Sequence, residues 1–211
     1  FVYRGWNEGR AGRRVFDAVW PHVTGAGRLA LNLRFGHPDR FPRQHEQHLY
    51  PSDQFPFAYV QNTDPWSGKT DAILRRPATD PLVVHTQTSS EYWQRRGSLV
   101  HTDAFGVDLP EHPCARTYLF SGSQHHAAPG VPAQPGPHQN LANPLNTGSL
   151  LRALLVRLDA WATHGQAPPP SAVPRRQDGT LISARELRRR FPSIGDVRPP
   201  DEPNRLLEHD Y

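Results

Sequence analysis

Three short runs along the chain have the composition of β-strands. Residues 14–23 (RVFDAVWPHV) alternate Val, Phe and Trp with acidic or small residues, and Pro21 marks the end of the run as near. Residues 81–93 (PLVVHTQTSSEYW) and 116–126 (RTYLFSGSQHH) begin apolar and then turn polar. That pattern is typical of a buried parallel strand with a polar C-terminal end. We therefore expect strands within these three segments.

Two later segments predict helices. Asn146 or Thr147 could cap the start of the first, and Gly165 could end it. Six of its apolar side chains fall on one stripe at helical spacing, namely Leu150, Leu151, Leu154, Leu155, Leu158 and Trp161. The second segment, residues 185–191 (RELRRRF), predicts a solvated helical face, with a docking site for an acidic partner as the alternative.

The long connections between the expected strands decide the type of sheet. Parallel strands need crossovers rather than tight turns, and a strongly amphipathic helix must cover an apolar surface. The sequence therefore predicts an α/β fold with a mainly parallel sheet and flanking helices, built as one domain over residues 1–211. Residues 36–80 are expected to form an irregular, lid-like excursion, and residues 166–211 a C-terminal extension. The proline-rich stretches 129–137 and 168–174 predict surface connectors.

Composition excludes several classes of protein. The net charge is only +4, and the arginines are scattered among acids and prolines rather than interleaved with aromatics, so nucleic-acid binding is not expected. No apolar run approaches the ~20 residues that cross a bilayer, and no secretory signal is visible. Cys114 is the single cysteine, so neither an intrachain disulfide nor a thiolate-rich metal site can form. The sequence indicates neither the compartment nor the oligomeric state.

The chemistry is expected where the strands end. In open parallel sheets, functional side chains gather beyond the C-terminal ends of the strands. Glu91 ends one candidate strand, and His125 and His126 end the next. A carboxylate that holds an imidazole is the base half of a nucleophilic triad, and acid before His is the order of the α/β-hydrolase fold. Asp103 is the rival for the acid.

The nucleophile is harder to find. The strand-to-helix elbow G-x-S-x-G is absent, and Ser52 and Ser67 lie in the irregular excursion with no apolar strand before them. The chain contains no Met, and an amphipathic run is already under way at Phe1. We therefore expect the natural polypeptide to begin upstream, with the missing serine just before the first residue.

These residues carry a resemblance to a known family. The stretches SSEYW, SLVHTD, SGSQHH and APPPS resemble the bacterial "alpha/beta hydrolase domain" proteins, and the likeness runs through most of the chain. The resemblance implies a serine elbow similar to SQSGR immediately upstream of Phe1, and more chain after Tyr211. It puts the triad acid on Glu91 and the base on His125, and His126 stands where the family usually has glycine.

The expected function is that of a serine hydrolase acting on a small-molecule carboxylic ester, with no cofactor and no metal. The segment alone is expected to be inactive, because it would supply only the acid and the histidine of the triad. A non-catalytic binding module on the same scaffold is one alternative, and a histidine-ligated metallohydrolase is another. HEQH, residues 45–48, lacks the helical spacing of a zinc motif and is expected to be a loop. Trp20, Trp66 and Trp93 could line a substrate pocket or belong to the core.

Overall fold

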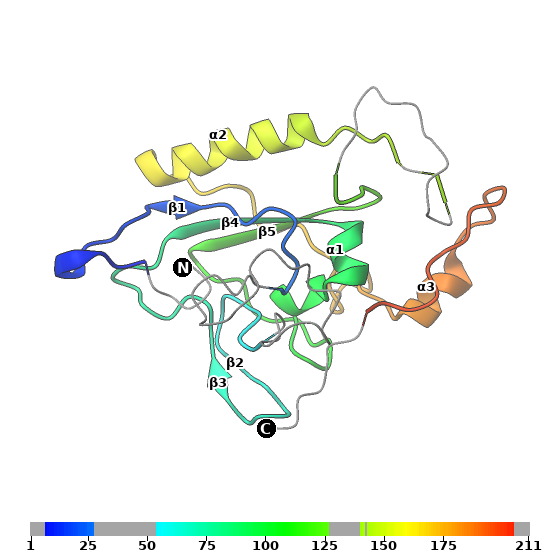
Figure 1. Ribbon diagram of the computed structural model, residues 1–211, viewed down its shortest axis with the longest axis horizontal. Helices are drawn as coiled ribbons and strands as arrows, with labels where there is room; N and C mark the ends of the chain where they lie inside the picture. The colour runs from blue at the N-terminus through cyan, green and yellow to red at the C-terminus, as the bar shows by residue number, and fades with distance from the viewer. Residues whose placement is uncertain (1–6, 28–53, 127–139, 142, 205–211) are drawn as a thin grey trace, which may run out of the picture.

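A three-stranded parallel sheet forms the centre of the molecule (Figure 1). Its strands are β1 (Ala18–Val19), β4 (Leu82–Thr88) and β5 (Ala115–Phe120), in the order β1-β4-β5. The computed structural model describes residues 7–27, 54–126, 140–141 and 143–204. Both pairings of the sheet are parallel. The mainly parallel sheet that the sequence predicts is therefore present, with its three strands inside the expected segments.

The strand limits differ from the prediction in two places. The expected strand at residues 14–23 reduces to β1 and a separate bridge between His22 and Thr86, on the far side of Pro21. The expected strand at residues 81–93 ends at Thr88, because Ser89–Gln94 form the helix α1. Glu91 therefore lies in the first turn of a helix, not on the polar end of a strand. The 3-10 helix η4 (Gly97–Val100) follows α1, and a short 3-10 turn, η2 (Arg10–Gly12), precedes β1.

The helix α2 (Gly148–His164) covers one face of the sheet (Figure 1). Leu158 and Trp161 are buried against Val84 of β4 and Tyr118 of β5. Gly165 ends α2 in the left-handed conformation, as expected, with φ of 69°. The predicted stripe is too wide, however. Leu150 and Leu155 are exposed, because a helix resting on a flat sheet buries only the narrow row that faces it.

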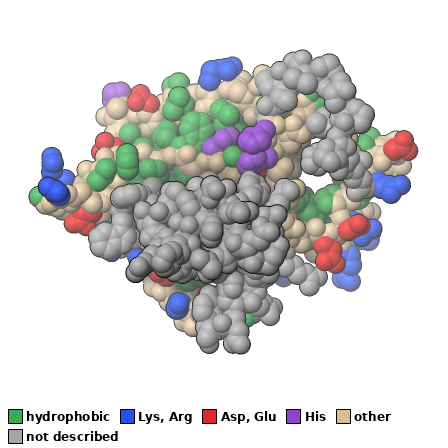
Figure 2. Space-filling model, in the orientation of Figure 1, with side chains coloured by type: hydrophobic (Ala, Val, Ile, Leu, Met, Phe, Trp, Pro, Cys, Tyr) green, Lys and Arg blue, Asp and Glu red, His purple; other side chains and the backbone are tan. Residues whose placement is uncertain are grey.

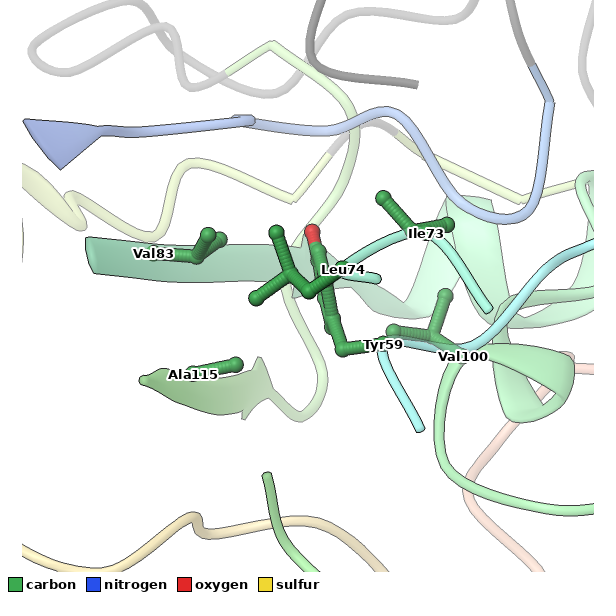
Figure 3. Packing of buried hydrophobic residues seen from close by; sticks show 6 residues of the cluster. All are labelled: Tyr59, Ile73, Leu74, Val83, Val100 and Ala115. Atoms are coloured by element: carbon green, nitrogen blue, oxygen red, sulfur yellow. The ribbon is translucent and has the colours of Figure 1, made fainter. Parts of the chain in front are cut away.

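The opposite face of the sheet carries a second hydrophobic cluster (Figure 3). Val83 of β4 and Ala115 of β5 pack there against side chains from outside the sheet: Tyr59, Ile73, Leu74 and Val100. Successive side chains of β4 therefore point to opposite faces of the sheet. Val83 and Val84 lie on different faces, and both are fully buried. The sheet is covered on both sides, which explains why β4 begins with consecutive apolar residues.

The described part of the 36–80 excursion, residues 54–80, belongs to this second layer. It contains the antiparallel hairpin β2 (Asn62–Thr63) and β3 (Thr70–Asp71), so the expectation of no regular structure was wrong there. Tyr59, Ile73 and Leu74 fix it to the sheet. Residues 36–53 lie outside the described residues, and the lid function of the excursion stays a prediction.

The C-terminal part of the chain closes the β5 edge of the sheet. Ala172 forms a parallel bridge with Tyr118, and its backbone N–H donates to the carbonyl of Thr117 at 2.9 Å. The stretch 168–174 is therefore an edge cover rather than the surface connector that we expected. The helix α3 (Ala184–Arg190) follows and buries no residue, in agreement with the predicted solvated face. The other connector, residues 129–137, lies outside the described residues.

Among the described glycines whose φ is not positive, Gly97 is the one where an added methyl group should be most disruptive. A Cβ there would lie 2.0 Å from Oε1 of the buried Gln87, whose Nε2 donates to the Gly97 carbonyl at 3.0 Å. We expect Gly97→Ala to lower the free energy of unfolding by about 1–3 kcal/mol, measured by urea denaturation. Gly9→Ala is the control, because its nearest neighbour is the exposed Val15 at 3.3 Å. Equal stability of the two variants would contradict the packing argument.

His85 should make the fold sensitive to acid. Burial lowers its pKa to about 3, and the ring lies between the hydroxyls of Tyr59 and Thr24, at 2.8 and 3.3 Å. The unfolded chain binds a proton near pH 6.5, so this stability is complete above that pH and is lost as the pH falls toward 3. In urea denaturation between pH 7.5 and 4.5, the free energy of unfolding should fall with pH below about 6.5, and His85→Gln should reduce that slope by about 1.4 kcal/mol per pH unit. A slope that is the same in His85→Gln as in the unmodified protein would contradict this prediction.

Candidate active site

Glu91 is a buried carboxylate at the start of α1. Thr88 ends β4 in an extended conformation and precedes the first helical residue, which makes Glu91 the third residue of the helix. The Thr88 backbone N–H donates to Glu91 Oε2 at 2.8 Å, and the Thr88 hydroxyl donates to the same oxygen. The side chain is 1% exposed. One carboxylate oxygen is thus used to cap the helix.

The second oxygen of Glu91 holds His125. Glu91 Oε1 lies 2.5 Å from His125 Nδ1, and the His125 side chain is 29% exposed. An ionised carboxylate can only accept, so the proton of this bond is on Nδ1. The neutral ring then has its lone pair on Nε2, at the more exposed side of the pair. This is the tautomer that a general base needs.

The loop that carries His125 is fastened to the first turn of α1. The His125 backbone N–H donates to Ser90 Oγ at 3.1 Å, and the Gly122 N–H donates to Ser89 Oγ at 2.9 Å. The Ser89 N–H donates to the Ser123 carbonyl at 3.1 Å. Three consecutive residues of α1, Ser89 to Glu91, therefore each bind this loop. The ring of His125 is positioned by the same turn that supplies its carboxylate.

The rival residues make different contacts. Asp103 Oδ1 accepts the backbone N–H groups of Phe105 and Val107, at 2.9 and 2.8 Å, and so stabilises its own turn. His126 is exposed and lies edge-on to His125, with ring centroids 4.2 Å apart. Of the two predicted acids and two predicted histidines, the structure brings together Glu91 and His125.

Of the two candidate serines of the excursion, one lies in the described ranges and is engaged elsewhere. The Ser67 hydroxyl donates to Asp64 at 2.5 Å in the turn between β2 and β3, and Ser52 lies outside the described residues. In the part of the chain that the structure describes, no serine hydroxyl is bonded to the ring of His125. Residues 45–48 also lie outside it, and the described residues contain no group of three His, Cys, Asp or Glu side chains that could hold a metal ion.

The tryptophans are divided between core and surface. Trp20 is partly buried against the cluster beneath α2, whereas Trp66 is 56% exposed. Trp93 is half-buried in α1, and its carbonyl accepts the backbone N–H of Asn204 at 2.8 Å. Trp66 borders a small cavity with Phe55, Phe57 and Leu99, and neither Trp20 nor Trp93 lines that cavity.

Two features of the site were missed in the sequence. The spacing Thr88-x-x-Glu91 is a helix-capping signature and could have predicted α1. His22 lies close enough to the pair for Glu91, His125 and His126 all to influence its pKa. It was overlooked because Pro21 was read as a sign that the strand was near its end, and no local motif marks a pairing that resumes after proline. Figure 2 shows histidine side chains close together on the face in view, bordered by hydrophobic ones.

Comparison with family models decides the relationship. The model described as "Alpha/beta hydrolase domain" matches residues 2–200. The chain belongs to this family. Comparison with curated proteins and with solved structures gives no match.

The alpha/beta hydrolase assignment agrees with the architecture. The parallel sheet with flanking helices carries Glu91 after β4 and His125 after the neighbouring β5, in the acid-then-histidine order of such folds. Among the described residues, no helix is long and apolar enough to cross a membrane. The family relationship supports a hydrolase-like fold, and the reaction itself is the subject of the proposal that follows.

Proposed function

We propose that the protein is a serine hydrolase that cleaves carboxylic esters, with Glu91 and His125 as the acid and base of its triad. The observation that carries the proposal is the 2.5 Å hydrogen bond between Glu91 Oε1 and His125 Nδ1. It lies beyond the C-terminal ends of two neighbouring parallel strands, where α/β proteins place their catalytic groups. The buried carboxylate has no solvent to stabilise it and depends on the donors of Thr88 and His125.

The nucleophile in this proposal is a serine upstream of Phe1. His125 Nε2 takes the hydroxyl proton as the serine oxygen adds to the ester carbonyl, and Glu91 stabilises the resulting imidazolium. The imidazolium returns the proton to the alkoxide that leaves, and an acyl-enzyme remains. Water then adds with His125 again as base, and the serine is released with its proton. Backbone N–H groups, one of them directly after the serine, would stabilise the oxyanion.

The experiment that tests the proposal is labelling of the full natural polypeptide with a fluorophosphonate, followed by peptide mapping. The 211-residue segment is treated in parallel. A labelled serine shortly upstream of Phe1, with no label on the segment alone, is the expected result. The reagent reports an activated serine and requires no knowledge of the natural substrate.

The other outcomes separate the alternatives. Absence of label on the full polypeptide would reject the serine mechanism. Loss of hydrolysis on chelation would then favour the metallohydrolase, and absence of any hydrolysis would favour a binding module. Label on Ser52 or Ser67 would contradict the arrangement of the site, since it would put the nucleophile inside the segment.

A further inference from the structure

A third imidazole, His22, follows β1 and bridges Thr86 of β4, two residues before the Thr88 that donates to Glu91, and it has no part in the reaction proposed above. The pKa of His22 is lowered, mainly because the ring has lost part of its solvent. The charge of Glu91 raises this pKa, and His125 and His126 lower it further. His22 is therefore neutral at neutral pH, although the residue as a whole is exposed. A neutral imidazole has one donor and one acceptor nitrogen, and which is which depends on its partners.

Hydrogen bonds fix the tautomer of His22. Trp20 Nε1–H can only donate, and it donates to Thr86 Oγ1 at 2.8 Å. The same oxygen lies 2.7 Å from His22 Nδ1. Among the described residues, Nδ1 is the acceptor to which the Thr86 hydroxyl donates its proton. Since Nδ1 accepts, the ring proton is on Nε2. His22 thus keeps an N–H donor on the edge turned away from Thr86.

The backbone around His22 is held under strain. Val23 has φ of 52°, a left-handed conformation that a β-branched residue rarely adopts. Its N–H donates to the Thr86 carbonyl at 2.8 Å, and the Ala26 N–H donates to the Arg95 carbonyl at 2.9 Å. The turn is therefore tied to β4 at one end and to the end of α1 at the other. Strain of this kind persists where the surrounding structure fixes a side chain for function.

We propose that His22 is a substrate-positioning residue whose Nε2–H donates a hydrogen bond to an acceptor oxygen of the ester bound against His125. The inference rests on the proposed ester hydrolysis. His125 offers a lone pair on Nε2, whereas His22 offers a proton, so the two rings have opposite polarity. The serine hydroxyl needs the first, and the carbonyl or alkoxy oxygen of an ester accepts from the second.

The test compares His22→Leu with His22→Gln in the full polypeptide, using p-nitrophenyl esters. Leucine removes the donor, whereas glutamine retains an N–H group. We expect kcat/KM to fall about 10- to 100-fold in His22→Leu, because the ester oxygen that accepts this bond gains negative charge in the transition state. His22→Gln should recover most of the loss. Thermal unfolding is recorded for both variants.

The controls separate this inference from the function on which it rests. Both variants should still be labelled at the upstream serine by fluorophosphonate, because Glu91 and His125 are intact. Absence of label on the unmodified protein would reject the ester hydrolase itself. A labelled protein whose kcat/KM is unchanged in His22→Leu would reject only the role of His22, as would a loss confined to the melting temperature.

A measurement on the unmodified protein covers the case in which His22→Leu does not fold. ¹⁵N NMR of histidine-labelled protein, with His22 assigned through the His22→Gln spectrum, reports which ring nitrogen carries the proton. An Nε2–H tautomer at neutral pH supports the proposal. An Nδ1–H tautomer overturns it, because no donor would then face the substrate.

Discussion

His125→Asn in the full polypeptide is expected to lower kcat/KM for ester hydrolysis about 10⁴- to 10⁶-fold. Asparagine is shorter than histidine, and its amide nitrogen is not a base, so the serine would have to attack without giving up its proton. The binding of substrate and the oxyanion donors would remain, and they set the residual rate. The measurement is hydrolysis of a series of p-nitrophenyl esters, with the fluorophosphonate labelling rate as a second readout.

His126→Asn is the matched control for this prediction. It makes the same chemical change on the adjacent, exposed ring, which lies 4.2 Å from that of His125 but is not bonded to Glu91. We expect the rate to stay within about threefold. If the large loss appeared in His126→Asn instead, His126 would be the base, and the proposed geometry would be wrong.

The strands could be predicted from the sequence because both faces of the sheet are covered. Val83 and Val84 point to opposite clusters and are both fully buried, so β4 begins with an unbroken apolar run, Leu82–Val84. The bridge at Ala172 could not be predicted, since a single paired residue leaves no periodic pattern. The exposed leucines of α2 were misjudged for a related reason. Helical spacing shows which side chains share a face, but not how much of that face the sheet covers.

The candidate pair could be predicted for a different reason. Glu91 and His125 follow adjacent parallel strands, and topology alone brings such positions to one edge of the sheet. The helix that carries Glu91 was missed because its capping signature was read as the polar end of a strand. His22 could not be found in this way. It reaches the site through the bridge between His22 and Thr86, which continues the pairing of β1 with β4 past Pro21. The Pro21 carbonyl accepts the Thr86 N–H at 3.0 Å, and proline has no N–H that would need a partner.

Glu91→Gln is expected to lower kcat about 10⁴-fold while leaving the protein folded. The carboxylate accepts from three donors, which are the N–H and hydroxyl of Thr88 and Nδ1–H of His125. An amide has one acceptor oxygen only. When that oxygen faces the two donors of Thr88, its NH₂ group faces His125 and forces the ring to accept at Nδ1. The ring proton then moves to Nε2, and the base is in the wrong tautomer.

Asp103→Asn provides the comparison that makes this result decisive. It is the same replacement of carboxylate by amide, and the asparagine oxygen can still accept the N–H groups of Phe105 and Val107. We expect its kcat to remain within about threefold of the unmodified protein, and both variants to melt within a few degrees of it. Near-normal turnover in Glu91→Gln together with a large loss in Asp103→Asn would assign the orienting acid to Asp103. The bond between Glu91 and His125 would then serve only to fasten the loop to α1.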